Sequence, residues 1–164
     1  MSEADSEAIL KVLLDHGVDF VVIGASAAIL QGVPIAATLD LDVTAATTKA
    51  NLKRLEAALK GLDATLRVPD PDDGVAVNLD AKMLMQMSVV TMLTRYGPFD
   101  LLFAPAGSPT YVELKQHAVE VVPFCMPFKV ARIEDLISMK RAAGREKDAA
   151  HLTVLLEFLR RSDR

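Results

Sequence analysis

The sequence predicts an α/β fold in which helices flank a mixed β-sheet, on three observations. Short apolar runs alternate with amphipathic helical segments over residues 6–60, which is typical of strands connected by helices. Two further apolar runs are separated by the turn-forming residues 95–98 and predict a β-hairpin. The chain then ends in a pair of amphipathic segments, so the sheet is expected to be covered by helices.

In the first part of the chain, hydrophobic spacing and capping residues define the elements. The expected elements are a helix over 6–16, a strand over 19–23, a short helix over 27–31, a strand over 40–43 and a helix over 49–60. Asp5 or Ser6 can cap the first helix, and Thr47 or Thr48 can cap the last, because their side-chain oxygens accept from free backbone N–H groups.

The second part is more irregular. Proline, aspartate and glycine are dense over residues 69–74 and predict a loop, and Gly144 marks the end of a helix. The other expected elements are a strand over 63–68, a helical turn over 80–85, strands over 88–93 and 99–103, a helix over 109–118, strands over 119–124 and 128–130, and helices over 132–142 and 147–160.

Composition narrows the class of protein. The 164 residues are 51% hydrophobic, so we expect one domain over 1–164 with a C-terminal helical part over 131–164. The net charge of −4 argues against a non-specific nucleic-acid coat. The only cysteine, Cys125, allows no disulfide framework and is expected to be a small buried apolar residue. The acidic start and the lack of a long apolar run predict a cytoplasmic protein.

Four methionines gather in one stretch, at Met83, Met85, Met87 and Met92. Methionine is flexible and fills irregular gaps, so packing in the core is the default interpretation. A soft surface that binds a partner is the alternative.

Two aspartates of one expected strand are the first candidate site residues. Residues i and i+2 of a strand share a face, so Asp40 and Asp42 point together while Leu41 and Val43 point into the core. Two close carboxylates repel each other unless a cation lies between them, and carboxylate oxygens suit Mg²⁺ or Mn²⁺. The alternative is a solvated pair of aspartates at the end of a strand.

Two more features point to the same chemistry. Gly24 follows a buried strand and begins a helix, where backbone N–H groups and the hydroxyl of Ser26 could bind an anion; the alternative is a tight turn with Ser26 as the helix cap. Asp100 is a charged residue within an apolar strand and needs a partner or a metal. If its strand lies beside that of Asp40 and Asp42, the three carboxylates converge; otherwise Asp100 pairs with an arginine such as Arg95.

The order of these motifs resembles the DNA polymerase beta-type nucleotidyltransferases, and more specifically their small bacterial members, the minimal and abortive-infection-toxin-like enzymes. The resemblance lies in Gly24-Ala25-Ser26, Asp40-Leu41-Asp42 and the later Asp100, and the segments 132–140 and 143–148 are similar to the C-terminal helix pair of that group. It covers residues 10–160.

The resemblance implies the nucleotidyltransferase fold and the transfer of a nucleoside monophosphate from a nucleoside triphosphate to a hydroxyl group. Mg²⁺ or Mn²⁺ would be held by Asp40, Asp42 and Asp100, which are also the implied catalytic residues. The implied nucleotide contacts are Gly24, Ala25, Ser26, Lys140 and Lys147. For the two lysines, a solvated helix surface or a local pair with Asp148 is the alternative.

The implied acceptor is RNA, notably tRNA, a protein or a small molecule, and a toxin–antitoxin role with an antitoxin as partner would follow from the toxin-like relatives. The chain departs from the family's pattern in two places. Ala25 stands where a second glycine or a serine is usual, and Ala36, Ala37 and Leu39 replace polar or basic residues before the aspartate pair. The alternative function is therefore a non-catalytic module that binds a nucleotide or a protein on the same fold.

Overall fold

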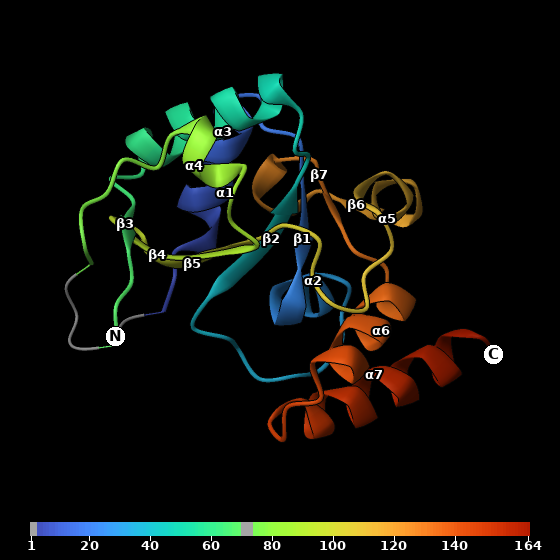
Figure 1. Cartoon of the computed structure of the whole chain (residues 1–164). Coiled ribbons are helices and arrows are strands. Elements are labelled where there is room, and N and C mark those ends of the chain that lie inside the picture. The colour runs from blue at the N-terminus through green and yellow to red at the C-terminus, as the bar shows by residue number, and fades with distance from the viewer. Residues whose placement is uncertain (1–2, 70–73) are drawn as a thin grey trace. The chain divides into compact units, whose positions relative to one another are not determined.

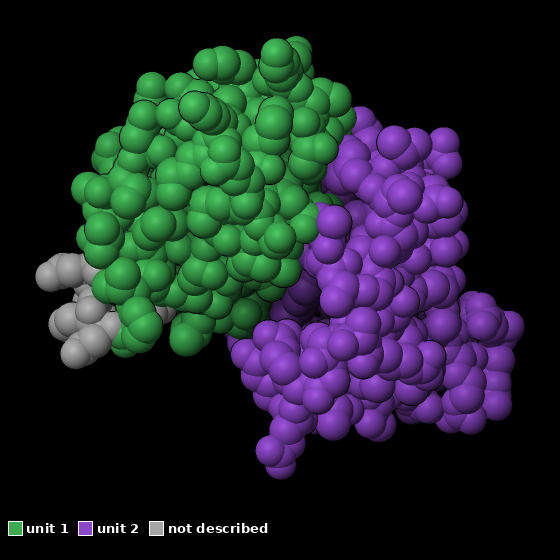
Figure 2. All heavy atoms as spheres, in the orientation of Figure 1, with its two compact units in different colours: residues 1–20, 38–103 green, residues 21–37, 104–164 purple. Residues whose placement is uncertain are grey.

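The computed structural model describes residues 3–69 and 74–164, and these form two compact units. Unit 1 comprises residues 1–20 and 38–103, and unit 2 comprises residues 21–37 and 104–164; Figure 2 shows them in different colours. Each unit is built from segments that are far apart in the sequence. The assignment of residues 1–164 to a single domain stays a prediction.

Unit 1 contains helices that cover strands paired both parallel and antiparallel (Figure 1). Its strands pair in the order β3-β4-β5-β2, with β2 parallel to β5 and the other pairs antiparallel. The elements are α1 (Ser6–Asp15), β2 (Leu41–Ala45), α3 (Lys49–Gly61), β3 (Thr65–Leu66), α4 (Ala81–Leu84), β4 (Val89–Thr94) and β5 (Gly97–Leu102).

The core of unit 1 follows from period-2 alternation in its strands. Leu41 and Val43 of β2 and Phe99 and Leu101 of β5 are fully buried, whereas the aspartates between them are not. The hairpin between β4 and β5 turns through only two residues, and Gly97 adopts φ +106°, which a side chain would disfavour. Phe99 and Asp100 therefore face opposite sides of the strands.

The side-chain amide of Asn51, which is buried, hydrogen-bonds the start of α3 to the residue that follows β2. The side chain of Thr48 caps the helix by accepting from the Asn51 N–H at 3.2 Å. The Asn51 amide donates to the carbonyls of Ala46 (2.7 Å) and Asp19 (3.0 Å), and its oxygen accepts from the Asp19 N–H. Because Asn51 is almost fully buried, these bonds fix where the chain leaves β2.

Unit 2 contains the strands β1, β7 and β6 in that order, with β1 parallel to β7 and β6 antiparallel to it. Phe20, the first residue of β1, belongs to unit 1. The C-terminal helices α6 and α7 pack against each other, and α2 contacts α6. The elements are β1 (Phe20–Ile23), α2 (Gly24–Leu30), α5 (Tyr111–His117), β6 (Val119–Val121), the 3₁₀ helix η1 (Pro123–Cys125), β7 (Phe128–Val130), α6 (Ile133–Ala143) and α7 (Asp148–Ser162).

The expected α/β fold with a mixed sheet and flanking helices is confirmed, and most elements begin and end within a few residues of their predicted bounds. Asp5 caps α1, and Thr48 rather than Thr47 caps α3. Residues 70–73 of the predicted loop lie outside the described residues. No helix in the described part of the chain is both long and apolar enough to cross a membrane.

Two expectations around Cys125 are wrong. The predicted strand over 119–124 ends at Val121, because Pro123 has no N–H to donate to a neighbouring strand and Phe124 adopts φ +57°. The side chain of Cys125 is exposed rather than buried, and its backbone is also left-handed, at φ +59°.

Candidate active site

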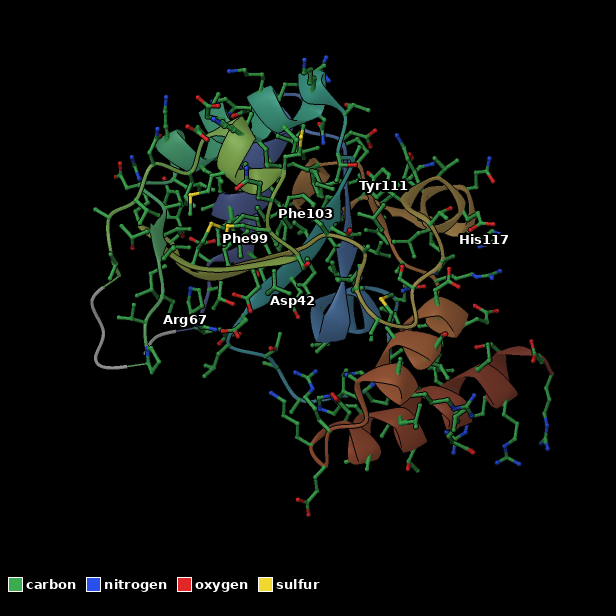
Figure 3. The ribbon with its side chains drawn as sticks, viewed as in Figure 1. Asp42, Arg67, Phe99, Phe103, Tyr111 and His117 are labelled. Atoms are coloured by element: carbon green, nitrogen blue, oxygen red, sulfur yellow. The ribbon has the colours of Figure 1, made fainter. Side chains whose placement is uncertain are left out.

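Two of the predicted site residues lie side by side on neighbouring strands. Strands β2 and β5 run parallel, and their register pairs Asp42 with Asp100. Both residues occupy positions between fully buried apolar neighbours, so each points away from the core. Figure 3 shows Asp42 below the strands β4 and β5, on the side opposite to Phe99. The strand adjacency on which the convergence of carboxylates depends is therefore present.

Asp40 lies one residue before β2 begins. Its backbone N–H donates to the Thr38 hydroxyl at 3.4 Å, and its side chain is 31% exposed. The preceding residue, Leu39, accepts from the Ala4 N–H at 3.0 Å. Asp40 thus reaches the same end of β2 as Asp42 from a segment that is fixed by the N-terminal residues.

An arginine contacts two of the three carboxylates. Arg67 Nη1 lies 3.3 Å from Asp40 Oδ1, and Nη2 lies 3.7 Å from Asp100 Oδ1. Its backbone N–H donates to the Thr91 carbonyl at 2.9 Å, which holds residue 67 against β4. Only 21% of the Arg67 side chain is exposed, so its charge is partly removed from solvent and acts strongly on the two aspartates.

The carboxyl group of Asp100 has a pKa that is raised from 3.8 to about 6. Burial is the largest cause and the neighbouring Asp40 also raises the pKa, whereas Arg67 and a backbone hydrogen bond from Met92 lower it. Its Oδ1 atom is buried and has no hydrogen-bond partner. An ionised, buried carboxylate with an unsatisfied oxygen is costly unless a cation approaches it.

These carboxylates fit a divalent cation by the chemistry of their oxygens and by the unsatisfied Asp100 Oδ1. Within the described residues, no three acidic, histidine or cysteine side chains form a ready-made metal cage. The guanidinium of Arg67 instead lies on Asp40 and Asp100. Cation binding would therefore need Arg67 to give way and the three carboxylates to close up.

The predicted anion-binding residues belong to unit 2. Helix α2 begins directly at Gly24, whose φ of +70° requires glycine, and its N-cap residue is Ile23. Ser26 therefore lies inside the helix, and the alternative interpretation of Ser26 as the N-cap is wrong. Ala25 and Ser26 are partly exposed, and their part in nucleotide binding stays a prediction.

The two predicted lysines differ in their surroundings. Lys140 is only 11% exposed and lies 3.3 Å from Asp148 Oδ1, so the local pair with Asp148 is present. Arg145 binds the other oxygen of Asp148 at 2.7 Å, and the pKa of Asp148 is lowered because these cations outweigh its burial. Lys147, one residue before α7, is exposed.

Sequence reasoning missed Arg67 and named the wrong arginine. Arg95, the arginine suggested as a partner of Asp100 in the alternative interpretation, instead pairs with Asp63 at 2.9 Å on the surface. Arg67 belongs to the stretch 63–68 that was predicted as a strand, and a strand beside the hairpin would carry it next to Asp100. The pattern offered no signal that β3 would be the neighbour of β4.

Comparison with solved structures identifies the fold. A candidate nucleotidyltransferase from Thermotoga maritima matches with a TM-score of 0.55 over 96% of this chain and 96% of its own, at 16% identity. The crystal structure of ANT(2″)-Ia in complex with adenylyl-2″-tobramycin matches with a TM-score of 0.58 over 92% of this chain and 85% of that one, at 15% identity. A solution structure of the antibiotic-resistance factor ANT(2″)-Ia gives a TM-score of 0.56 over 92% and 80% of the two chains, at 16% identity.

No family model matches this sequence, and the search of curated proteins found no match. At identities of 15–16% the structural likeness establishes the fold and leaves substrate and activity open. The likeness nevertheless agrees with the resemblance seen in the motifs of the sequence. This chain has the fold of the small nucleotidyltransferases.

Proposed function

We propose that this protein transfers a nucleoside monophosphate from a nucleoside triphosphate to a hydroxyl group. One observation carries the proposal: Asp42 and Asp100 stand in register on parallel strands of a nucleotidyltransferase fold, with a buried oxygen of Asp100 left without a hydrogen bond. A structural role alone gives no reason to place two carboxylates on adjacent strands, because they repel each other.

In the proposed reaction, the oxygen of the acceptor hydroxyl attacks the α-phosphorus of the triphosphate. The new P–O bond forms as the bond to the β-phosphate oxygen breaks, and pyrophosphate leaves with that electron pair. The hydroxyl proton passes to the carboxylate of Asp100, which acts as the general base. Gly24, Ala25, Ser26, Lys140 and Lys147 are the proposed nucleotide contacts.

Asp40, Asp42 and Asp100 would hold Mg²⁺ or Mn²⁺. When bound, such a cation neutralises the charge that develops on the phosphate oxygens and favours the ionised acceptor. Arg67 keeps the carboxylates together in the free protein by neutralising Asp40 and Asp100. Once displaced, its guanidinium is suited to a phosphate and supplies the positive charge that Ala36 and Ala37 cannot.

The proposed acceptor is an RNA, a protein side chain or a small molecule, and the compartment is the cytoplasm. ANT(2″)-Ia has been captured with adenylyl-2″-tobramycin, which makes a small polyhydroxylated molecule a useful acceptor to include. A toxin–antitoxin role with an antitoxin partner stays a prediction from the sequence resemblance.

The test uses each of the four α-labelled nucleoside triphosphates with Mg²⁺, in separate arms containing total bacterial RNA, cell protein or tobramycin. The comparison protein carries Asp40→Asn and Asp42→Asn. Label transferred by the unmodified protein alone supports the proposal and names donor and acceptor class.

One observation favours a second function, a non-catalytic module that binds a nucleotide or a protein. Arg67 already neutralises two of the three carboxylates, and a binding module would need no more. Nucleotide binding that does not respond to Mg²⁺, without transfer in any arm, would support that function and overturn the first.

A further inference from the structure

A cavity of about 600 Å³ lies on unit 1, apart from the carboxylates. It is lined by residues from the start of α3 and from α4, two helices that contact each other (Figure 1). None of the three aspartates Asp40, Asp42 and Asp100 lines this cavity. The volume of the cavity lies within the range of about 300–1,000 Å³ that is usual for small-molecule sites.

The rim of this cavity is positively charged. Lys49 and Lys53 belong to the start of α3 and Lys82 to α4, and all three are exposed. The N-terminus of a helix is itself positive and favours acidic side chains, yet the first turn of α3 contains none. Lysines there cost stability to the helix, and an anion bound beside them would remove that cost.

The rim charges are only partly compensated by the protein. Lys53 Nζ lies 3.8 Å from Glu56, which also accepts from the Ala81 N–H at 2.9 Å and from Lys60 at 3.5 Å. Among the described residues, no acidic side chain lies within ion-pair distance of Lys49 or Lys82. Two ammonium groups of the rim are therefore available to a ligand.

The floor of the cavity is apolar. Leu52 is fully buried beneath it, alanines from both helices line it, and Met85 is 58% exposed at its edge. An exposed, flexible thioether can adapt to an apolar chain. Among the described residues, no arginine, tyrosine, phenylalanine or histidine lines the cavity, so stacking of a nucleobase and bidentate binding of a phosphate are both disfavoured.

We propose that this cavity is a second site, which binds a small amphiphilic anion. The carboxylate or phosphate headgroup lies among Lys49, Lys53 and Lys82, and an alkyl chain packs against Met85 and the alanines of the two helices, Ala50 and Ala81. The proposal is independent of the proposed transferase activity, because none of these residues belongs to the candidate active site.

Calorimetric titration with eight-carbon probes tests the pairing of charge and chain. Octanoate and octyl phosphate represent the two anionic headgroups, octanol and octyltrimethylammonium keep the chain with a neutral or positive head, and acetate keeps the head alone. We expect both anions to bind at least about ten-fold more tightly than octanol, with no binding of the cation or of acetate. Shortening octanoate to butanoate should weaken binding by up to about four-fold per buried methylene.

Two variants with equal loss of charge locate the site. Lys49→Gln/Lys82→Gln should weaken octanoate binding by about five-fold or more, whereas the control Lys11→Gln/Lys129→Gln should leave it unchanged. With ¹³C-labelled methionine methyl groups, octanoate should shift the Met85 signal and leave that of the buried Met92 in place. Met85→Ala identifies the Met85 signal.

Three results would overturn the proposal: octanol binding as tightly as octanoate, equal binding by the two double-lysine variants, or an unmoved Met85 signal at saturating octanoate. None of these results depends on transferase activity. Binding of both anionic probes supports the proposal, and the absence of octanoate binding overturns it.

Discussion

Replacement of Arg67 by glutamine tests the electrostatics of the candidate site most directly. The guanidinium lies 3.3 Å from Asp40 and 3.7 Å from Asp100. At an effective dielectric constant of about 20, unit charges at these distances attract by about 4–5 kcal/mol per pair. Desolvation and ordering of the side chains offset most of this, so we expect Arg67→Gln to lower the free energy of unfolding by about 1–3 kcal/mol at pH 7 without divalent cations.

The same change should have the opposite effect on cation binding. A divalent cation that enters the unmodified protein must displace the guanidinium, whereas in Arg67→Gln it meets two carboxylates with no competing positive charge. We expect the affinity for Mn²⁺ alone, measured by electron paramagnetic resonance, to rise by about ten-fold, equivalent to about 1.4 kcal/mol. Saturating Mn²⁺ should then restore much of the lost stability, because it binds only the folded state.

Arg95→Gln is the matched control, since it removes the same group from a surface pair with Asp63 in which both side chains are about half exposed or more. It should change stability by less than about 1 kcal/mol and leave Mn²⁺ affinity as it was. Mn²⁺ binding by Arg67→Gln that is no tighter than in the unmodified protein would refute the idea that Arg67 competes for the cation site.

Three further predictions concern the same charges. Asp100→Asn should lower the rate of label transfer by at least about 100-fold. It should nevertheless raise the free energy of unfolding at pH 7 by about 1 kcal/mol, because it removes a carboxylate whose ionised form is disfavoured by burial. Lower stability of this variant in urea denaturation would contradict the prediction. The folded pKa of Asp100, about 6, lies above its ordinary value of 3.8, so its contribution to stability is complete below pH 3.8 and is lost as the pH rises to about 6. The affinity for Mn²⁺ should rise over the same pH range. Asp100→Asn should show neither the fall in stability nor the rise in affinity. Asp148→Ala leaves the largely buried Lys140 without its carboxylate, and thermal and urea unfolding should show a loss of about 2–3 kcal/mol. The control Glu157→Ala, at an exposed ion pair, should lower stability much less.

Much of the fold could be predicted because hydrophobic periodicity reports which face of an element is buried. The alternation Asp40-Leu41-Asp42-Val43 and the charged Asp100 within an apolar run indicated two strands with acidic solvent-side positions, and the structure pairs those strands. Capping residues and glycines predicted where several helices begin or end, including the start of α3 at Thr48 and the end of α6 at Gly144. These signals are local, so they can be recognised in the sequence without knowledge of the tertiary structure.

The rest depended on contacts between distant segments. Arg67 reaches Asp100 because the two-residue strand β3 pairs with β4, which in turn pairs with β5, and no periodicity in residues 63–68 specifies that neighbour. The apolar run that ends at Phe124 predicts a strand over 119–124, but the left-handed backbone at Phe124 and Cys125 is visible only in the structure. Side-chain reach and backbone handedness are properties of the assembled chain.

The register that pairs Asp42 with Asp100 has a consequence for the folding kinetics. These residues are separated by 57 intervening positions, and the β4–β5 hairpin can form from local contacts before it docks on β2. Docking is the step that brings like charges together, so those charges should slow the last stage of folding rather than the first. A divalent cation, or Arg67, would speed this one step by neutralising the carboxylates that it brings together.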